Sequence, residues 1–423
     1  MAQHTSDSQL PQSSDATLGG QNPAPQQSGI LGGIDGIRQK LNSNELSIRL
    51  EALGQALDYG EAGRVCLQEA AASDSRVVRN RAQWLLRQGE GAVSAVGPVW
   101  SLPERFESVG NTQHVARFAN RQVRDFRPGQ VLGDPAEVVY ALRCDYDDND
   151  GINLFLGQLL DAPGSELIEA LVFGLWDGVD GVCTGDASAR SLVELLVEVR
   201  DRLPNLKALF IGDITYEECE ISWLAQTDMS PILQAYPQLE ILQVRGGVGL
   251  RFQNAARHEH LKALILETGG LSRETLYQVY AWDFPALEHL ELWFGSENYG
   301  GDCWEQDLSP VLEDLCFPKL IYLGLRNSKF ADEMSERVAA APLLNGLQVL
   351  DLSLGILSDE GAAKLLTCEA ARDLETLNVS QSYLSGAMID QLKASGISVR
   401  AVDQREEEDY EEPEYRRYCA VTE

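Results

Sequence analysis

The sequence predicts an α/β solenoid, a horseshoe in which parallel strands lie inside and helices lie outside. Residues 317–384 repeat one leucine pattern at fixed spacing, with cores at Leu320-x-x-Leu323-x-Leu325, Leu347-x-x-Leu350-x-Leu352 and Leu374-x-x-Leu377-x-Val379. Segments with helical patterns separate the copies. Because each unit can bury its leucines only against the next unit, a stacked array with a parallel strand ladder completes the core.

Earlier copies of the pattern extend the array toward the N-terminus. Their cores are Ile168-x-x-Leu171-x-Phe173, Leu206-x-x-Leu209-x-Ile211, Leu239-x-x-Leu242-x-Val244, Leu261-x-x-Leu264-x-Leu266 and Leu287-x-x-Leu290-x-Leu292. Residues 138–144 predict a further buried strand, and residues 152–160 predict a short helix. Ser358 and Ser385 are typical N-cap residues for two of the outer helices. The spacing of the cores is close to that of leucine-rich repeats.

The chain outside the array divides by composition and period. Residues 1–33 are rich in Gln, Ser, Pro and Gly, and they predict a disordered segment. Residues 34–92 carry apolar side chains at intervals of three and four, which predicts a small all-α module. Residues 93–130 lack a sustained period and are interpreted as a linker or an irregular packing segment, followed by the repeat domain over 131–402. The charge run over 403–423 predicts an acidic, disordered tail.

Charge and cysteine usage narrow the function classes. The 423 residues carry a net charge of −31, which disfavours binding to a nucleic-acid backbone. The N-terminus lacks the basic and apolar regions of a signal peptide, and no apolar run is long enough to predict a membrane span. The eight cysteines form no C-x-x-C pair. We therefore expect reduced thiols and a cytoplasmic protein.

The strand positions that alternate with the leucines predict a binding face. Side chains on successive strand residues point to opposite faces, so these positions share the concave side of the horseshoe. Aromatic and arginine side chains, which are enriched in interface hot spots, are prominent among them. The candidate partner-binding residues are Arg245, Glu267, His289, Glu291, Trp293, Tyr322, Arg326 and Asp351. An alternative reading is that the arginines pair with Glu267, Glu291 or Asp351 and the aromatics only fill the face.

Other polar clusters give weaker signals. Glu217, Glu218 and Glu220 form an acidic loop that either caps a turn or faces a partner. His258, His260 and His289 lack the spacing of a zinc site. The acids between Asp145 and Asp150 miss the glycine and glutamate that a calcium loop requires. No catalytic or nucleotide-binding motif is present, so we predict no metal and no cofactor.

Several segments together resemble a bacterial family of acidic leucine-rich-repeat proteins with no established activity. The resemblance covers about residues 138–402 and is carried by residues 203–223, 242–247, 267–271, 287–293 and 322–328. Residues 357–362 are similar to the linking segment of ribonuclease-inhibitor-type repeats. Residues 75–86 resemble the second helix of a HEAT-type repeat of the kind found in cyanobacterial proteins. These resemblances imply the fold but supply no catalytic residue.

The sequence thus predicts a non-enzymatic scaffold that recognises a protein partner through the concave face. The partner is unidentified, and the acidic surface favours a basic one. Two alternatives remain open at this point. The chain could be a regulator or inhibitor that mimics a polyanion toward a basic partner, or a metal-dependent enzyme that uses its acidic loops.

Overall fold

The computed structural model describes residues 33–43, 46–73, 75, 78–79, 81–82, 85–86, 100, 112–127, 129–133, 135–144, 151–176, 182, 188–313, 316–410, 412 and 416–421. The predicted disordered segment up to residue 32 and the acids between Asp145 and Asp150 lie outside these residues. The chain divides into two compact units, residues 1–92 and 93–423, and each is described by itself.

The described part of the first unit is helical. It contains α1 (Ile34–Leu41), α2 (Leu46–Ala56), the 3-10 turn η1 (Leu57–Tyr59) and α3 (Gly60–Ala70). Leu53 and Leu67 are buried between these helices. Gly63 allows α3 to approach the end of α2, because a Cβ at this position would lie 1.7 Å from the Ala56 carbonyl oxygen. The all-α module over residues 34–92 and its HEAT-type assignment both stay predictions.

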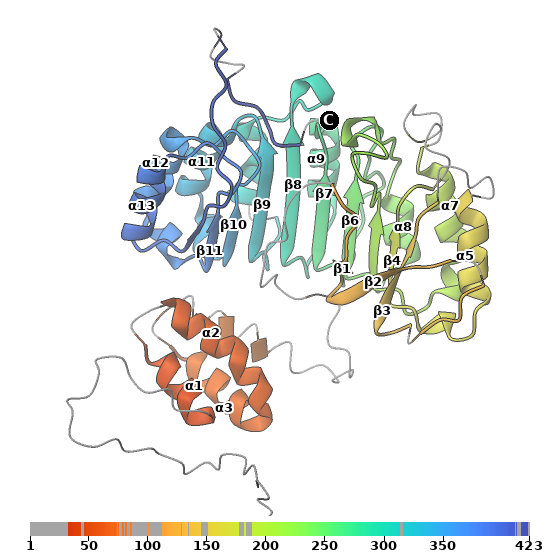
Figure 1. Cartoon of the computed structure of the whole chain (residues 1–423), viewed down its shortest axis with the longest axis horizontal. Helices are drawn as coiled ribbons and strands as arrows, with labels where there is room; N and C mark the ends of the chain where they lie inside the picture. Colours follow the sequence, from red (N-terminus) through yellow and green to blue (C-terminus); the bar gives the residue numbers. More distant parts are fainter. Residues whose placement is uncertain are drawn as a thin grey trace, which may run out of the picture. The chain divides into compact units, whose positions relative to one another are not determined.

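The described residues of the second unit form a 12-stranded sheet whose strands follow the sequence order (Figure 1). The strands are β1 (Arg117–Phe118), β2 (Arg121–Asp125), β3 (Val138–Leu142), β4 (Ala170–Phe173), β5 (Ala208–Ile211), β6 (Ile241–Arg245), β7 (Ala263–Glu267), β8 (His289–Gly295), β9 (Tyr322–Ser328), β10 (Val349–Asp351), β11 (Thr376–Asn378) and β12 (Val399–Arg400). β1 is antiparallel to β2, and every later pair is parallel. The parallel ladder is the arrangement that the repeated leucine pattern predicts.

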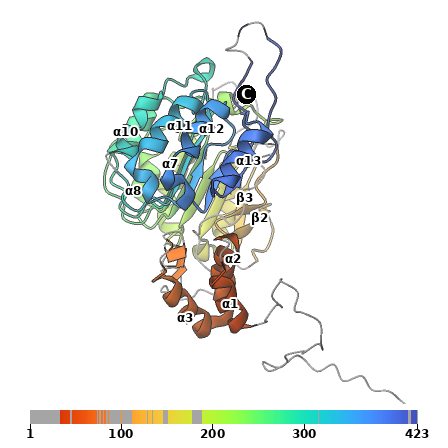
Figure 2. The same cartoon turned by 90° about the vertical axis from the view of Figure 1, so that its left-hand side faces the viewer.

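Helices cover one face of the sheet (Figures 1 and 2). They are α5 (Gly151–Asp161), α7 (Arg190–Glu198), α8 (Ser230–Ala235), α9 (Arg273–Ala281), α10 (Ser309–Leu312), α11 (Ala331–Ala340), α12 (Asp359–Leu366) and α13 (Gly386–Ala394). The 3-10 segments η2 (Ser165–Leu167), η3 (Arg200–Arg202), η4 (Ile221–Trp223), η5 (Glu297–Tyr299), η6 (Glu305–Leu308), η7 (Pro342–Asn345) and η8 (Glu369–Asp373) complete the turns. Ser358 and Ser385 cap α12 and α13 as predicted. The strand leucines and the helices share one continuous core.

The opposite face of the sheet, here called the concave face, has a second apolar cluster over β3–β7. It contains Val172, Phe210 and Ile241, and it is covered by Trp100 and Phe118 from the segment before β2. The rings of Phe118 and Phe210 lie 6.0 Å apart. Part of residues 93–130, which the sequence left open as a linker or an irregular packing segment, therefore covers the concave face and adds two strands to the sheet edge. Its two-residue and five-residue strands are too short to show a period.

The C-terminal residues also differ from the expectation of a solvated tail. In the described part of this tail, Cys419 and Val421 are buried, and Val421 belongs to the main core. Two exposed acids have partners within the tail, since Glu407 lies 3.6 Å from Arg417 and Glu408 accepts a hydrogen bond of 2.9 Å from the Tyr418 hydroxyl. Composition predicted solvation of the whole tail because it does not reveal which residues of a charged segment are buried.

Candidate functional site

The structure places all eight candidate concave-face residues on adjacent strands. In the strand register, Arg245 is paired with Glu267, His289 with Tyr322, and Trp293 with Arg326. All eight side chains belong to buried residues, with exposed fractions between 0% for Asp351 and 7% for Arg326. The expected common face is present, but these residues are not accessible on it.

Six of these residues form one hydrogen-bonded group, here called the Glu291 cluster: His289, Glu291, Trp293, Tyr322, Arg326 and Asp351. Glu291 is at its centre. Its Oε1 accepts hydrogen bonds from Arg326 Nη1 at 2.6 Å and from Trp293 Nε1 at 2.8 Å. Its Oε2 lies 3.3 Å from both His289 Nε2 and the Tyr322 hydroxyl. The carboxylate is therefore satisfied by its neighbours on β8 and β9.

Asp351 extends the cluster onto β10. Its Oδ2 accepts hydrogen bonds from the Tyr322 hydroxyl at 3.0 Å and from Asn378 at 2.9 Å, and it lies 3.6 Å from Arg326 Nε. The Arg326 guanidinium also lies 5.1 Å from the centre of the Trp293 ring, a cation–π contact. The His289 and Tyr322 rings stack with centroids 3.8 Å apart. The cluster therefore spans three strands without an exposed charge.

The neighbours of Glu291 and Tyr322 shift the pKa values of these two side chains in opposite directions. Burial alone would raise the pKa of Glu291, but the Arg326 charge and the His289 hydrogen bond outweigh it and lower that pKa below its ordinary value. Burial, with the charges of Asp351 and Glu291, raises the pKa of Tyr322 well above its ordinary value, so the phenol keeps its proton and donates it. The cluster thus contains ionised Glu291 beside a neutral Tyr322.

Gly324 makes room for this arrangement. A Cβ at this position would lie 2.9 Å from Glu291 Cγ and 3.1 Å from the Tyr322 ring. Any side chain on this residue of β9 would therefore push the Glu291 carboxylate away from Arg326.

Arg245 and Glu267 form a second buried ion pair on the concave face. Arg245 Nε donates to Glu267 Oε2 at 2.6 Å. The sequence left open that the two arginines pair with acidic residues of the same face, and these are the contacts that Arg245 and Arg326 make in this structure.

The predicted acidic loop lies at the carboxyl end of β5. We call residues 214–223 the edge loop. Of its acids, Glu217 and Glu220 are exposed, whereas Glu218 is partly buried. Glu218 Oε2 accepts hydrogen bonds from the backbone N–H and hydroxyl of Thr215, at 2.7 and 2.9 Å. The three acids therefore have different roles, which their adjacency in sequence does not reveal.

Two large aromatic residues are exposed on the edge loop. Tyr216 is 49% exposed and Trp223 is 56% exposed, although Ile214 and Ile221 of the same loop are fully buried. The loop is thus fixed to the core by apolar side chains while it presents a phenol and an indole to solvent. No pattern in the sequence identifies the exposure of these two aromatic side chains.

His114 connects the edge loop to the segment that covers the concave face. Its Nε2 lies 3.4 Å from Glu218 Oε1, and its Nδ1 lies 3.6 Å from Asp213 Oδ2. Burial lowers the pKa of His114, but the hydrogen bonds with Asp213 and Glu218 outweigh burial and raise that pKa to about 9. Asp213 also accepts from the Val115 backbone N–H at 3.1 Å and pairs with Arg143. No sequence pattern identifies His114 as a candidate, because the residues around it lack a sustained period.

The chain has a leucine-rich-repeat-like fold. A crystal structure of a Bacteroides fragilis protein aligns with a TM-score of 0.60 and 27% identity, over 67% of this chain and 77% of that chain. An internalin from Listeria monocytogenes aligns with a TM-score of 0.30 and 14% identity, over 59% of this chain and 70% of that chain. A TLR13–ssRNA13 complex aligns with a TM-score of 0.31 and 14% identity, over 64% of this chain and 33% of that chain. No protein-family profile and no curated protein matches the chain.

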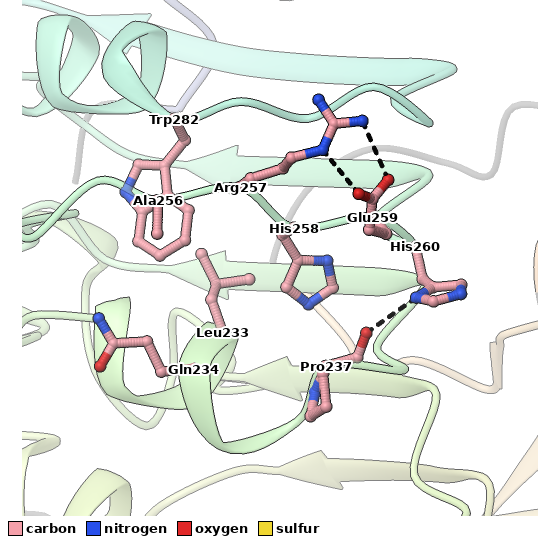
Figure 3. A pocket seen from close by; sticks show the side chains of 9 residues that line it. All are labelled: Leu233, Gln234, Pro237, Ala256, Arg257, His258, Glu259, His260 and Trp282. Atoms are coloured by element: carbon pink, nitrogen blue, oxygen red, sulfur yellow. Dashed lines mark hydrogen bonds and ion pairs between the residues drawn. The ribbon is translucent and has the colours of Figure 1, made fainter.

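A small pocket lies on the helix side of this leucine-rich-repeat-like fold (Figure 3). It has a volume of about 210 Å³ and is lined by Leu233, Gln234, Pro237, Ala256, Arg257, His258, Glu259, His260 and Trp282. Between β6 and β7 the described chain has no helix, which leaves this hollow beside α8. Several of its polar side chains have partners: His260 Nδ1 lies 3.0 Å from the Pro237 carbonyl oxygen, and Arg257 pairs with Glu259.

The histidines of the metal hypothesis are used in hydrogen bonds. His258 Nε2 lies 3.2 Å from the Tyr236 carbonyl oxygen, and His258 Nδ1 accepts from the Leu261 N–H at 3.1 Å. His289 belongs to the Glu291 cluster. Across the residues that the structure describes, no group of three or more potential metal ligands comes together.

One cysteine departs from the expectation of reduced thiols, because Cys219 of the edge loop is disulfide-bonded. Disulfides are typical of proteins from oxidising compartments, so the cysteines do not support the predicted cytoplasmic location. That location stays a prediction. No described helix combines the length and apolar character that crossing a membrane requires.

Proposed function

We propose that this protein is a non-enzymatic interaction scaffold that binds a partner protein through the edge loop. The observation that carries this proposal is the exposure of Tyr216 and Trp223 on a loop whose other apolar residues are buried. Tyrosine and tryptophan are the residue types most enriched in interface hot spots. Burial of the exposed part of an indole by a partner stabilises the complex.

The anchoring of the edge loop supports this role. Ile214 and Ile221 are fully buried, Thr215 binds Glu218, and Cys219 is disulfide-bonded. A loop that is already ordered loses little conformational entropy when a partner binds. The two aromatic side chains therefore present a preorganised contact surface.

The charge around these aromatics favours a basic partner. Glu217 and Glu220 are exposed on either side of the partly buried Glu218, and the whole chain carries a net charge of −31. Acidic residues at the rim of an interface steer a basic partner toward it and increase the association rate. This arrangement combines an aromatic anchor with acidic surroundings.

The concave-face candidates take a supporting role in this proposal. Arg326 and Glu291 already bind each other in a buried network, so a partner would have to displace those contacts to use them. Their direct participation in binding remains a prediction from the sequence. We propose that these residues stabilise the strand ladder.

Alanine substitution tests the assignment. Once a partner has been recovered by affinity purification and purified, its affinity is measured by calorimetry for Trp223→Ala and Tyr216→Ala. We expect each to weaken binding by more than about fivefold, because hot-spot truncations cost more than about 1 kcal/mol. Trp304→Ala is the matched control, since Trp304 is 54% exposed in a different turn. Equal losses for Trp223→Ala and Trp304→Ala would contradict the placement.

A further inference from the structure

The last described residues of the chain lie across the carboxyl ends of β8–β11. The Cys419 thiol lies 3.8 Å from the Gly295 carbonyl oxygen, and the Tyr418 backbone N–H donates to the Tyr383 hydroxyl at 3.1 Å. We call the surface formed by Gly295, Asn327, Leu354, Ile356 and Tyr383 the tail-binding surface.

Backbone hydrogen bonds hold the tail on this surface. The Ala420 N–H donates to the Leu354 carbonyl oxygen at 2.7 Å, and the Val421 N–H donates to Asn327 Oδ1 at 3.0 Å. The Asn327 amide in turn donates to the Val421 carbonyl oxygen. Asn327 thus binds both backbone groups of one tail residue, which is the way a protein recognises an extended peptide of any sequence.

Side chains add sequence preference. Cys419 and Val421 are buried, with exposed fractions of 2% and 7%, so small or β-branched apolar residues fit at these positions. Arg417 Nη1 donates to the Ile356 carbonyl oxygen at 3.1 Å and pairs with Asp332 at 3.4 Å. The surface therefore selects an arginine, followed after one residue by two small residues and a valine.

The tail reaches this surface through an exposed connection. Residues 406–410 are all exposed. The outgoing and returning segments contact each other, since the Glu408 N–H donates to the Arg416 carbonyl oxygen at 2.9 Å. The exposed residues 406–410 separate the docked residues from β12, so the release of the docked residues needs no change in the strand ladder.

We propose that the tail-binding surface is a peptide-binding site that recognises an extended segment of a partner protein with the chemistry of residues 417–421. The chain's own tail occupies the site as a tethered competitor. A short tether gives the tail an effective concentration of roughly millimolar, so a partner segment has to bind more tightly than the tail or be presented together with other contacts. This inference is independent of the edge loop.

The experiment begins with the full-length protein, so that folding takes place with the tail present. A protease site replaces residues 411–415, the folded protein is cut there, and the released fragment is removed by dialysis. A fluorescently labelled peptide of residues 416–423 is then titrated against cut and uncut protein, and binding is followed by fluorescence anisotropy. We expect saturable binding to the cut protein and at least about tenfold weaker binding to the uncut protein.

Two variants report on the recognition chemistry. Asn327 has a φ of 53°, which glycine adopts without strain, so Asn327→Gly removes the side-chain amide while it keeps the backbone conformation. Loss of both hydrogen bonds should weaken peptide binding to the cut protein by at least about tenfold. A peptide carrying Val421→Asp should bind at least about tenfold more weakly too, because it would bury a carboxylate.

Three outcomes would overturn the proposal. In the first, the fragment leaves only when circular dichroism shows that the second unit unfolds, which would make the tail a fixed part of the core. In the second, cut and uncut proteins bind the peptide equally, which would place the peptide elsewhere. In the third, the uncut protein forms a dimer by exchanging tails, which would make a second copy the occupant.

Discussion

Glu291 shows how single residues are held in the strand ladder. Its carboxylate and the Arg326 guanidinium are both buried, and each is the other's principal charged neighbour on β8 and β9. Removing one member of such a pair leaves the other as an uncompensated buried charge. The same contacts that make these residues poor candidates for an accessible hot spot make them important for stability.

The first prediction concerns that charge. Glu291→Gln should lower the free energy of unfolding by about 3 kcal/mol, because Arg326 loses its closest carboxylate. Urea denaturation followed by circular dichroism measures the change. Glu297→Gln is the control: Glu297 pairs with Lys329 but its side chain is 62% exposed, so the loss there should be below about 1 kcal/mol. Similar losses in both variants would refute the structural role of the Glu291 cluster.

The second prediction concerns pH and His114. Its pKa is raised from 6.5 to about 9, so its contribution is complete below pH 6.5 and is lost as the pH rises through 9. The pKa values of Asp213 and Glu218 are lowered, so their contributions are present above their ordinary pKa range and are lost in acid. Urea midpoints measured from pH 5 to pH 10 should fall at the alkaline end in the native protein. The alkaline decline should be smaller in His114→Gln.

At the level of elements, β8 and β9 depend on a residue without a side chain. Gly324→Ala would place a methyl group 2.9 Å from Glu291 Cγ. We expect a loss of about 1 to 3 kcal/mol in the free energy of unfolding, as for other overpacked sites. Gly386→Ala is the control at the start of α13, where an added Cβ meets nothing within 4 Å. That control should be neutral or slightly stabilising.

The repeated strands could be predicted because each copy carries the same three apolar positions. The cores beginning at Ile168 and Leu374 lead directly into β4 and β11, in the expected parallel order. β1 and β12 could not be predicted, because two residues show no alternation. The loops that follow the strands were predicted only in part, since the sequence does not show which residues of a long insertion are buried.

The candidate site was predicted in part for a related reason. Strand alternation placed Arg326 and Glu291 on one face, which the structure bears out in geometry. It did not show that Trp100 and Phe118 cover the neighbouring part of that face, because these residues are distant in sequence. For the same reason, the disulfide at Cys219 and the docking of Val421 are invisible to any local pattern.

For the whole molecule, the net charge of −31 raises the question of whether charge or aromatic contact dominates recognition. If Tyr216 and Trp223 anchor the partner, affinity should change by less than about fivefold between about 50 and 500 mM NaCl. A polyanion mimic would lose affinity far more steeply over that range. Calorimetric titration at several salt concentrations separates the two functions.

Hydrogen–deuterium exchange of the protein with and without its purified partner shows which surface the partner covers. We expect new protection at residues 214–223, where the exposed aromatics lie on an anchored loop, and unchanged exchange in β8 and β9. Protection gained in β8 and β9 with none at residues 214–223 would show that the partner binds the concave face, and it would contradict the assignment of recognition to the edge loop.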